Sequence, residues 1–161
     1  AIGYSALRML DASPKAKIIT IEKDEARYKE AIETIENLNK NEQIHVLLGD
    51  ALEILEQFQS KNETFDFIFI DAAKGKYKEF FQLVHPLLET GGLLVTDNVL
   101  FRNYVVDIEE APKRFKSMVR KIDEYNHMLT SHPEYITSIL PIGDGVMLSF
   151  KKEGRWLGND G

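Results

Sequence analysis

The chain of 161 residues contains no cysteine. Disulfide bonds, and zinc or iron–sulfur sites with thiolate ligands, are therefore excluded. Apolar runs long enough to cross a bilayer as a helix are also missing, so we expect no membrane partner. The formal net charge of −6 gives no general attraction to nucleic acid or anionic lipid, although it does not exclude a local basic patch. We expect a cytoplasmic protein.

What the sequence does contain is a regular alternation of strand-like and helix-like segments. Hydrophobic residues make up 43% of the chain and charged residues 29%, as in ordinary globular domains. The expected strands are residues 17–22, 44–48, 65–70 and 93–96, and the expected helices between them are 24–39, 51–58 and 77–88. Such alternation predicts βαβ units and an α/β fold with a mostly parallel sheet.

The last third of the chain departs from this alternation. A long helix is expected over about residues 109–129, and strands at 135–140 and 146–151 follow with only a turn between them. Two strands joined so closely pair in an antiparallel way. We expect a single domain over residues 1–153 and a tail over residues 154–161, to which we assign no role.

Each of the four expected parallel strands has an acidic residue at or just past its C-terminus. These residues are Glu22, Asp50, Asp71 and Asp97. In an open α/β sheet, ligands bind at the carboxyl ends of the strands. Any one of these acids could instead cap the following helix. Four of them on one edge of one sheet favour a binding site.

Three of the predicted sites suit a nucleoside-like ligand. A carboxylate placed like Glu22 can accept from both hydroxyls of a ribose. Asp50 follows a glycine, so the backbone can approach a flat base while the carboxylate accepts from its exocyclic amine. Gly3 and Ser5 lie in what looks like the end of a glycine-rich loop, where a helix N-terminus can bind a carboxylate. A plain helix start is the alternative for that loop.

The acids at the next two strand ends suggest a metal site. Asp71, Asp97 and Asn98 offer oxygen ligands without nitrogen or sulfur. That set suits Mg²⁺ or another hard divalent cation. The alternative is a salt bridge from an aspartate to Lys74 together with an asparagine turn. None of the four histidines is assigned to the metal.

Six motifs in this order and spacing resemble a known family. They are AIGYSA, IEKDE, GDA, FDFIFIDAAKGKY, VTDNVLFR and SILPIGDG. Together they resemble the cation-dependent O-methyltransferases related to catechol O-methyltransferase, and more narrowly the bacterial branch that methylates 5-hydroxyuridine in tRNA. The resemblance covers Ala1 to about Lys152. It implies a Rossmann-like fold with strand order 3-2-1-4-5-7-6 and an antiparallel last strand.

The resemblance also implies roles for individual residues. Contacts to S-adenosylmethionine fall on Gly3, Ser5, Glu22, Asp50, Ala51 and Asp71. The metal ligands are again Asp71, Asp97 and Asn98, and Lys74 is the catalytic base. We also expect a homodimer.

The sequence departs from the family in two places. The family's N-terminal helices and its first strand, which ends in a Glu-x-Gly-Thr stretch, are absent from this sequence. We therefore expect the sequence to be incomplete at its N-terminus, and a fragment without this central strand is not expected to fold well alone. In addition, Asn103 stands where the family usually has glycine.

The functional prediction is S-adenosylmethionine- and Mg²⁺-dependent O-methylation of 5-hydroxyuridine in tRNA. Two alternatives remain: a small catechol-like substrate, or a catalytically idle domain that binds a nucleotide or a partner protein. A nicotinamide dehydrogenase would leave the oxygen cluster without a purpose. The residues expected to contact tRNA are Arg102, Lys113, Arg114 and Lys116, with Arg120 and Lys121 on the same helix. The alternative is a solvated helix face partly neutralised by Asp123 and Glu124.

Overall fold

The computed structural model describes residues 3–153. Contacts divide the chain into two compact units, one ending at Gln57 and the other beginning at Phe58. The predicted tail over residues 154–161 lies outside the described residues. In the described part, no helix is both long and apolar enough to span a membrane.

Unit 1 is built on a pair of parallel strands. Strand β1 (Ile18–Glu22) pairs with β2 (Ile44–Leu48), with Ile18 opposite Ile44. Around them lie α1 (Tyr4–Ala12), α2 (Glu25–Asn37) and the first part of α3 (Ala51–Ser60). Helix α2 begins where the Asp24 side chain accepts a hydrogen bond from the amide of Arg27. The core of the unit consists of Ala6, Leu10, Ala31, Ile35, Ile44 and Val46.

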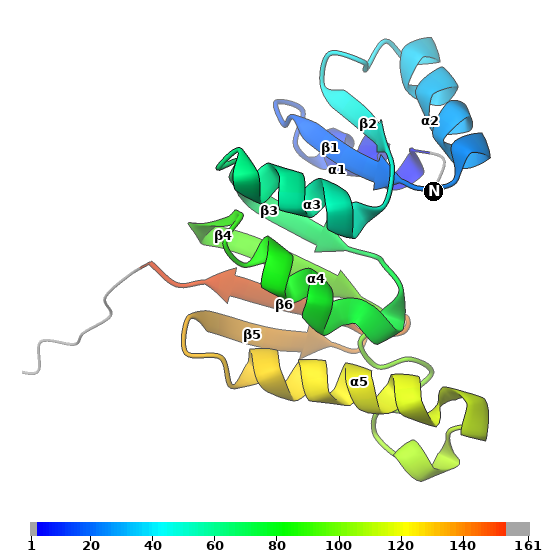
Figure 1. The fold of residues 1–161 in the computed structure, drawn as a ribbon, viewed down its shortest axis with the longest axis vertical. Helices are drawn as coiled ribbons and strands as arrows, with labels where there is room; N and C mark the ends of the chain where they lie inside the picture. Colours follow the sequence, from blue (N-terminus) through cyan, green and yellow to red (C-terminus); the bar gives the residue numbers. More distant parts are fainter. Residues whose placement is uncertain (1–2, 154–161) are drawn as a thin grey trace, which may run out of the picture. The chain divides into compact units, whose positions relative to one another are not determined.

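Unit 2 contains a four-stranded mixed sheet in the order β3-β4-β6-β5 (Figure 1). Its strands are β3 (Phe65–Ile70), β4 (Leu88–Asp97), β5 (Tyr135–Leu140) and β6 (Val146–Lys151). Strand β3 is parallel to β4, whereas β6 is antiparallel to both of its neighbours. The structure thus confirms the α/β fold with an antiparallel last strand.

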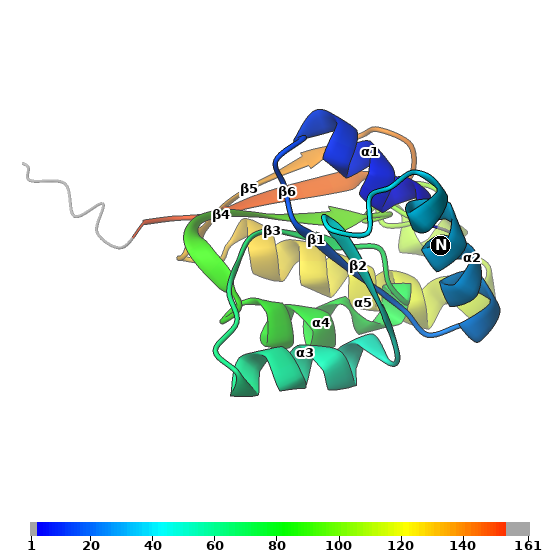
Figure 2. The same ribbon diagram turned by 90° about the horizontal axis from the view of Figure 1, so that it is seen from above.

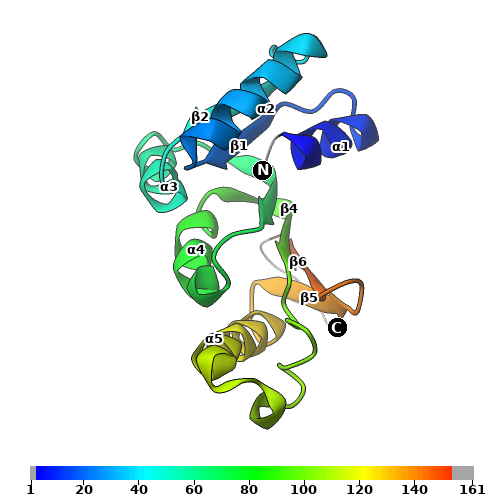
Figure 3. The same ribbon diagram turned by 90° about the vertical axis from the view of Figure 1, so that its right-hand side faces the viewer.

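Two helices cover one face of this sheet. They are α4 (Tyr77–Val84) and α5 (Lys113–Thr130), and both lie on the same side of β4, β5 and β6 in Figures 2 and 3. Short 3₁₀ turns precede them, η1 (Lys74–Lys76) before α4 and η2 (Ile108–Glu110) before α5. The helices bury apolar side chains such as Phe80, Val119 and Ile122 against the sheet.

The expectation of one sheet with all four acids on its edge is wrong for this structure. The acids divide between two sheets: Glu22 and Asp50 belong to unit 1, and Asp71 and Asp97 to unit 2. Among the described residues, β1 pairs only with β2, and β3 only with β4. The break falls where the family order places its first strand. The presence of that strand in the full-length protein stays a prediction. So does the single domain over residues 1–153.

Three predicted element boundaries were also wrong. Helix α4 ends at Val84 instead of 88, because Pro86 lacks the N–H that would continue the helical hydrogen bonds. Strand β4 begins at Leu88 and includes Gly92, where a Cβ atom would lie 2.8 Å from the carbonyl oxygen of Glu89. The long helix begins at Lys113, directly after Pro112, because residues 108–110 form η2.

Candidate functional site

The acidic strand ends of unit 1 are connected through the backbone. Glu22 is the last residue of β1, and its carbonyl oxygen accepts from the amide of Gly49 at 3.0 Å. Glu22 is only 8% exposed, and its carboxylate accepts from the Asp24 backbone amide at 2.9 Å and lies 3.5 Å from the Arg27 guanidinium. Burial raises the pKa of Glu22, but the Asp24 hydrogen bond and the Arg27 charge act against it, and the net pKa is lowered. An ionised carboxylate is therefore held at this strand end.

The other residues predicted in unit 1 lie at helix N-termini. Gly3 precedes α1 with φ +85°, a left-handed conformation that favours glycine, and Ser5 is exposed in the first turn of that helix. The Asp50 carboxylate accepts from the amide of Leu52 at 2.9 Å, and Ala51 is the first residue of α3. Helix N-termini present N–H groups that favour anionic and polar ligands. Asp50 thus caps a helix, as the alternative interpretation allowed, and it remains exposed.

In unit 2 the strand pairing brings the two predicted metal-binding aspartates to neighbouring strand ends. Ile70 pairs with Thr96, so Asp71 and Asp97 each follow one member of this pair. Both carboxylates act on the buried Tyr77 hydroxyl. Burial is the main cause of the raised pKa of Tyr77, and the charges of Asp71 and Asp97 raise it further. The sheet therefore places both acids close enough to Tyr77 for their charges to affect its pKa.

Lys74 and Asn98 meet at this strand end. The Lys74 ammonium donates to the Asn98 side-chain oxygen at 2.6 Å. Asn98 has φ +57°, and its amide donates to the Asp97 carboxylate at 2.7 Å. The asparagine turn is thus present. The aspartate–Lys74 salt bridge of the alternative interpretation is absent from the described residues, since Lys74 binds an amide oxygen instead.

The chemistry of these donors fits a hard divalent cation. Asp71, Asp97 and Asn98 supply oxygen atoms from two carboxylates and one amide, with substrate or water oxygens able to complete the coordination. Within residues 3–153, no group of three or more acidic or histidine side chains is arranged to hold a metal ion. The fit therefore depends on the Asn98 oxygen as the third ligand. The arrangement of Asp71, Asp97 and Asn98 around a bound ion stays a prediction.

The residues predicted to contact a substrate differ in their accessibility. Lys113 and Arg114 are exposed in the first turn of α5, where the Arg114 guanidinium lies 4.6 Å from the Phe115 ring centroid. Lys116 is half-buried and forms an ion pair with Glu109, so its charge is largely neutralised. These cations occupy one end of the helix.

A left-handed turn carries the fourth of these residues. Phe101, Arg102 and Asn103 have φ values of +37°, +55° and +61°. Such values are rare outside glycine, and asparagine tolerates them better than most residues. Asn103 can therefore replace the family's glycine. Buried Phe101 anchors the turn through an edge-to-face contact with Phe115, while Arg102 is exposed.

Sequence reasoning missed a set of buried polar residues behind the oxygen cluster. Tyr77 donates to the carbonyl oxygen of Asp97, Tyr125 pairs with Thr96, and Asn126 donates to the carbonyl oxygen of Val99. Helical periodicity had marked both tyrosines only as part of an apolar face. The available signal was the position of Tyr77, three residues after Lys74 in the same motif.

Comparison with known proteins decides the family. The chain matches the O-methyltransferase family over residues 1–152. It belongs to that family. Caffeoyl-CoA O-methyltransferase 5 from Nicotiana tabacum is 33% identical over 155 residues, which cover 91% of this chain and 63% of the relative. The chain thus spans less than two thirds of the length of this curated relative.

Solved structures of other proteins agree with this assignment. The crystal structure of a protein from Staphylococcus aureus, described as a caffeoyl-CoA O-methyltransferase, has 37% sequence identity to this chain and a TM-score of 0.83. The match covers 94% of this chain and 72% of that one. An O-methyltransferase from Bacillus cereus, solved in complex with SAH, has 28% identity and a TM-score of 0.74 over 84% of this chain and 63% of that one. Membership of the O-methyltransferase family is confirmed. The tRNA-modifying branch stays a prediction.

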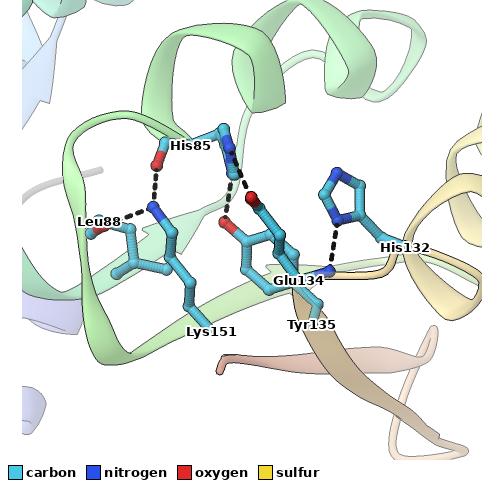
Figure 4. Close-up of polar contacts among 6 residues, drawn as sticks. All are labelled: His85, Leu88, His132, Glu134, Tyr135 and Lys151. Atoms are coloured by element: carbon cyan, nitrogen blue, oxygen red, sulfur yellow. Dashed lines mark hydrogen bonds and ion pairs between the residues drawn. The ribbon is translucent and has the colours of Figure 1, made fainter. Parts of the chain in front are cut away.

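A second polar cluster lies at the opposite edge of the unit 2 sheet, where β4 and β5 begin and β6 ends (Figure 4). The His85 ring pairs through Nδ1 with the Tyr135 hydroxyl at 2.9 Å and through Nε2 with Glu134 at 3.1 Å. Lys151 donates to the carbonyl oxygens of His85 and Leu88 at 2.7 and 2.8 Å. These bonds tie the end of α4 to the last two strands. The position of the cluster suits stability and not catalysis at Asp71.

The His85 cluster predicts a pH dependence of stability. Burial lowers the pKa of His85, the Lys151 and His132 charges lower it further, and Glu134 opposes them. The unfolded chain therefore binds a proton near pH 6.5 that the folded state still excludes. Stability should fall as the pH drops below about 6.5, until the folded-state pKa is passed.

Thermal unfolding of wild-type protein and of His85→Gln at pH 7.5 and pH 5.5 checks this expectation. Glutamine retains hydrogen bonding without titrating in this range, so His85→Gln should lose less stability on acidification. The exposed His127 on α5 provides the matched variant His127→Gln, which should keep the wild-type response. An unchanged acid response in His85→Gln would contradict the assignment to His85.

Proposed function

We propose that the full-length protein transfers a methyl group from S-adenosylmethionine to one of two neighbouring oxygen atoms on its substrate. The observation that carries the proposal is the cluster of Asp71, Asp97 and Asn98 with the Lys74 ammonium 2.6 Å from the Asn98 oxygen. Family membership supports the reaction class. The complex of the Bacillus cereus relative with SAH supports the cofactor.

The cofactor would be held by residues whose local structure suits its separate parts. The ionised Glu22 at the end of β1 suits the two ribose hydroxyls, and the exposed Asp50 suits the exocyclic amine of the base. The first turn of α1, with Gly3 and Ser5, suits the carboxylate of the methionine part. Ala51 leaves room beside the base, and Asp71 is assigned to both cofactor and metal.

For the metal we propose Mg²⁺ or another hard divalent cation held by Asp71, Asp97 and Asn98. When bound, such a cation lowers the pKa of a substrate hydroxyl and fixes its direction. Lys74 would accept the hydroxyl proton, and a positioned base contributes about 10²–10⁴ in rate. The substrate oxygen forms a bond to the methyl carbon while the carbon–sulfur bond breaks. Alignment of the two reactants supplies much of the remaining acceleration.

For the substrate we propose 5-hydroxyuridine in tRNA. The exposed cations Arg102, Lys113 and Arg114 support contacts to phosphates, and Glu124 pairs with Lys78 at 2.7 Å, so it neutralises its own helix only in part. A base would have to be splayed out of the tRNA to react. The second candidate is a small catechol-like compound, which the caffeoyl-CoA O-methyltransferase relatives favour. Both substrates present two adjacent oxygens. The homodimer likewise stays a prediction.

A methyl-transfer assay with the full-length protein, labelled S-adenosylmethionine, and either bulk tRNA or a catechol tests the proposal. Label in tRNA supports it, whereas label in the catechol alone supports the second candidate. Calorimetry with S-adenosylmethionine and with NAD accompanies the assay. Failure to bind S-adenosylmethionine and to label either substrate would favour the idle domain, and binding of NAD alone would favour a dehydrogenase.

Reversal of charge on α5 should separate the two substrates. The triple change Lys113→Glu, Arg114→Glu and Lys116→Glu should weaken tRNA methylation at least tenfold at low salt and reduce the salt slope by about 1.4, as expected for the two phosphate contacts of Lys113 and Arg114. Methylation of a catechol should be almost unchanged. Lys15→Glu, Lys17→Glu and Lys61→Glu change the same charge at exposed positions elsewhere and should have little effect on either substrate. Equal losses for both substrates in the α5 variant would remove this helix as the tRNA surface.

A further inference from the structure

The end of β4 is held by a succession of buried side chains from α4 and α5. The Tyr77 hydroxyl donates to the Asp97 carbonyl oxygen at 2.7 Å. The Asn126 amide donates to the Val99 carbonyl oxygen at 2.8 Å, and the Tyr125 hydroxyl pairs with the Thr96 hydroxyl at 2.7 Å. Three bonds thus hold three of the four residues from 96 to 99.

These bonds lie in the interior of unit 2. Tyr77, Tyr125, Thr96 and Asn126 are all at most 4% exposed. The rings of Tyr77 and Tyr125 pack with their centroids 5.3 Å apart. Phenylalanine would supply the same apolar packing without a buried hydroxyl, and burying a polar group is costly unless it is hydrogen-bonded. The hydroxyls therefore indicate a requirement at the strand end itself.

Asn126 supports the same conclusion from a different observation. Among residues 3–153, its side-chain oxygen is the one buried polar side-chain atom that has no hydrogen-bond partner. A leucine of similar shape would avoid leaving that acceptor unsatisfied. The unsatisfied oxygen is costly, but the side-chain nitrogen of the same residue donates a hydrogen bond to the Val99 carbonyl oxygen.

The residue between the two held carbonyl groups is Asn98. Its φ of +57° is unfavourable for a residue with a side chain, even though asparagine tolerates it better than most. In this conformation the backbone amide of Asn98 donates a hydrogen bond to the Asp97 carboxylate, and the side-chain oxygen of Asn98 accepts one from Lys74. With the carbonyl groups on both sides fixed, the backbone at Asn98 has little freedom to relax.

We propose that Tyr77 and Asn126 are positioning residues that hold Asn98 in its left-handed conformation and so set the places of Asp97, Asn98 and the Lys74 ammonium. The catalytic part of this inference rests on the proposed function. The conformational part concerns the fold alone. Neither side chain needs to touch substrate or cofactor, because both act through backbone carbonyl groups.

A double-mutant cycle tests the conformational part without reference to activity. Glycine adopts a positive φ readily, so Asn98→Gly removes the strain that the hydrogen bonds oppose. Tyr77→Phe should lower the midpoint of chemical unfolding in the Asn98→Gly background and lower it by clearly less in the wild-type background, because there the released Asn98 relaxes and the relieved strain offsets part of the lost hydrogen bond. Asn126→Leu should behave in the same way. Equal losses in the two backgrounds would overturn the proposal.

Amide hydrogen exchange and binding of Mn²⁺ test the effect on the cluster. Tyr77→Phe should speed exchange of the Asn98 and Val99 amides roughly five- to tenfold, the effect expected of one lost hydrogen bond. Mn²⁺ affinity of the full-length protein should weaken by a similar factor, and kcat should fall more than KM changes.

Tyr135→Phe is the matched control for these measurements. It also removes a nearly buried hydroxyl that hydrogen-bonds within unit 2, but at the opposite edge of the sheet. It should leave exchange at Asn98, Mn²⁺ affinity and kcat unchanged. Equal effects of Tyr77→Phe and Tyr135→Phe would show a general loss of stability and overturn the positioning role. If Mn²⁺ does not bind even wild-type protein while the cycle and the exchange behave as expected, the conformational role stands and the metal-dependent function fails.

Discussion

Asp71→Ala should lower turnover of the full-length protein by at least about a thousandfold, because this carboxylate is assigned to both the cation and the cofactor and several kcal/mol of transition-state stabilisation depend on the cation alone. Asp71 follows β3 next to the strand end that carries Asp97, and both charges reach Tyr77. Steady-state kinetics at saturating S-adenosylmethionine measure the loss. Asp66→Ala is the matched control, since it removes an exposed carboxylate near the opposite end of the same strand and should keep near-normal turnover.

Glu22→Ala should have a smaller and different effect. Loss of charge-assisted hydrogen bonds to a ribose is worth about 1.5–3 kcal/mol, or roughly ten- to 150-fold in cofactor affinity. Turnover at saturating cofactor should be largely retained. Because Glu22 also accepts from the Asp24 amide, Glu22→Gln separates loss of charge from loss of that local bond. Equal kinetic losses in the Asp71 and Glu22 variants would contradict the division of roles.

Removal of divalent cations should lower turnover by at least about a hundredfold. The oxygen donors Asp71, Asp97 and Asn98 suit a hard cation, so added Mg²⁺ should restore activity after treatment with a chelator. The measurement compares full-length protein before chelation, after it, and after readdition of Mg²⁺. Calorimetry on the same samples shows whether S-adenosylmethionine still binds.

Two controls make the chelation experiment decisive. Asn98→Ala removes the third oxygen donor and should raise the Mg²⁺ concentration needed for half-maximal recovery. Asp144→Ala, on the turn between β5 and β6, alters a carboxylate not assigned to the cation and should not change it. Full activity in the chelated sample would exclude the cation-dependent mechanism, even if the methyl-transfer reaction itself were established.

The boundaries of several strands follow from local sequence. Strands β2, β3, β5 and β6 have the predicted bounds, and β1 differs by one residue. Each is a short apolar run closed by residues that favour turns, and such a pattern acts over a few neighbouring positions. For the same reason, acids directly after the strands could be located without knowledge of the pairing. The positions of Glu22, Asp50, Asp71 and Asp97 are therefore sequence-determined.

The pairing of the strands was less accessible, since it depends on contacts between distant parts of the chain. Local pattern predicted that β5 and β6 are antiparallel, but not that β6 inserts between β4 and β5 in the sheet of unit 2. That order entered only through the family resemblance. The early start of β4 also depends on its partner, because the register shifts between Phe65 and Phe67 of β3.

By itself, the sequence determined the α/β class, the family and the chemical identity of the donors at the strand ends, since these depend on residue type and spacing. Only the tertiary structure decided how those donors are used. Lys74 lies close to Asp71 in sequence, and Asp71 lies close to Asp97 in the sheet. The lysine nevertheless binds the side-chain oxygen of Asn98, whose backbone has a left-handed conformation. In the sequence pattern, phenylalanine at positions 77 and 125 would fit the apolar helix faces as well as Tyr77 and Tyr125 do. Their hydroxyls acquire partners only when α4 and α5 pack on the sheet and bring Asp97 and Thr96 within hydrogen-bonding distance.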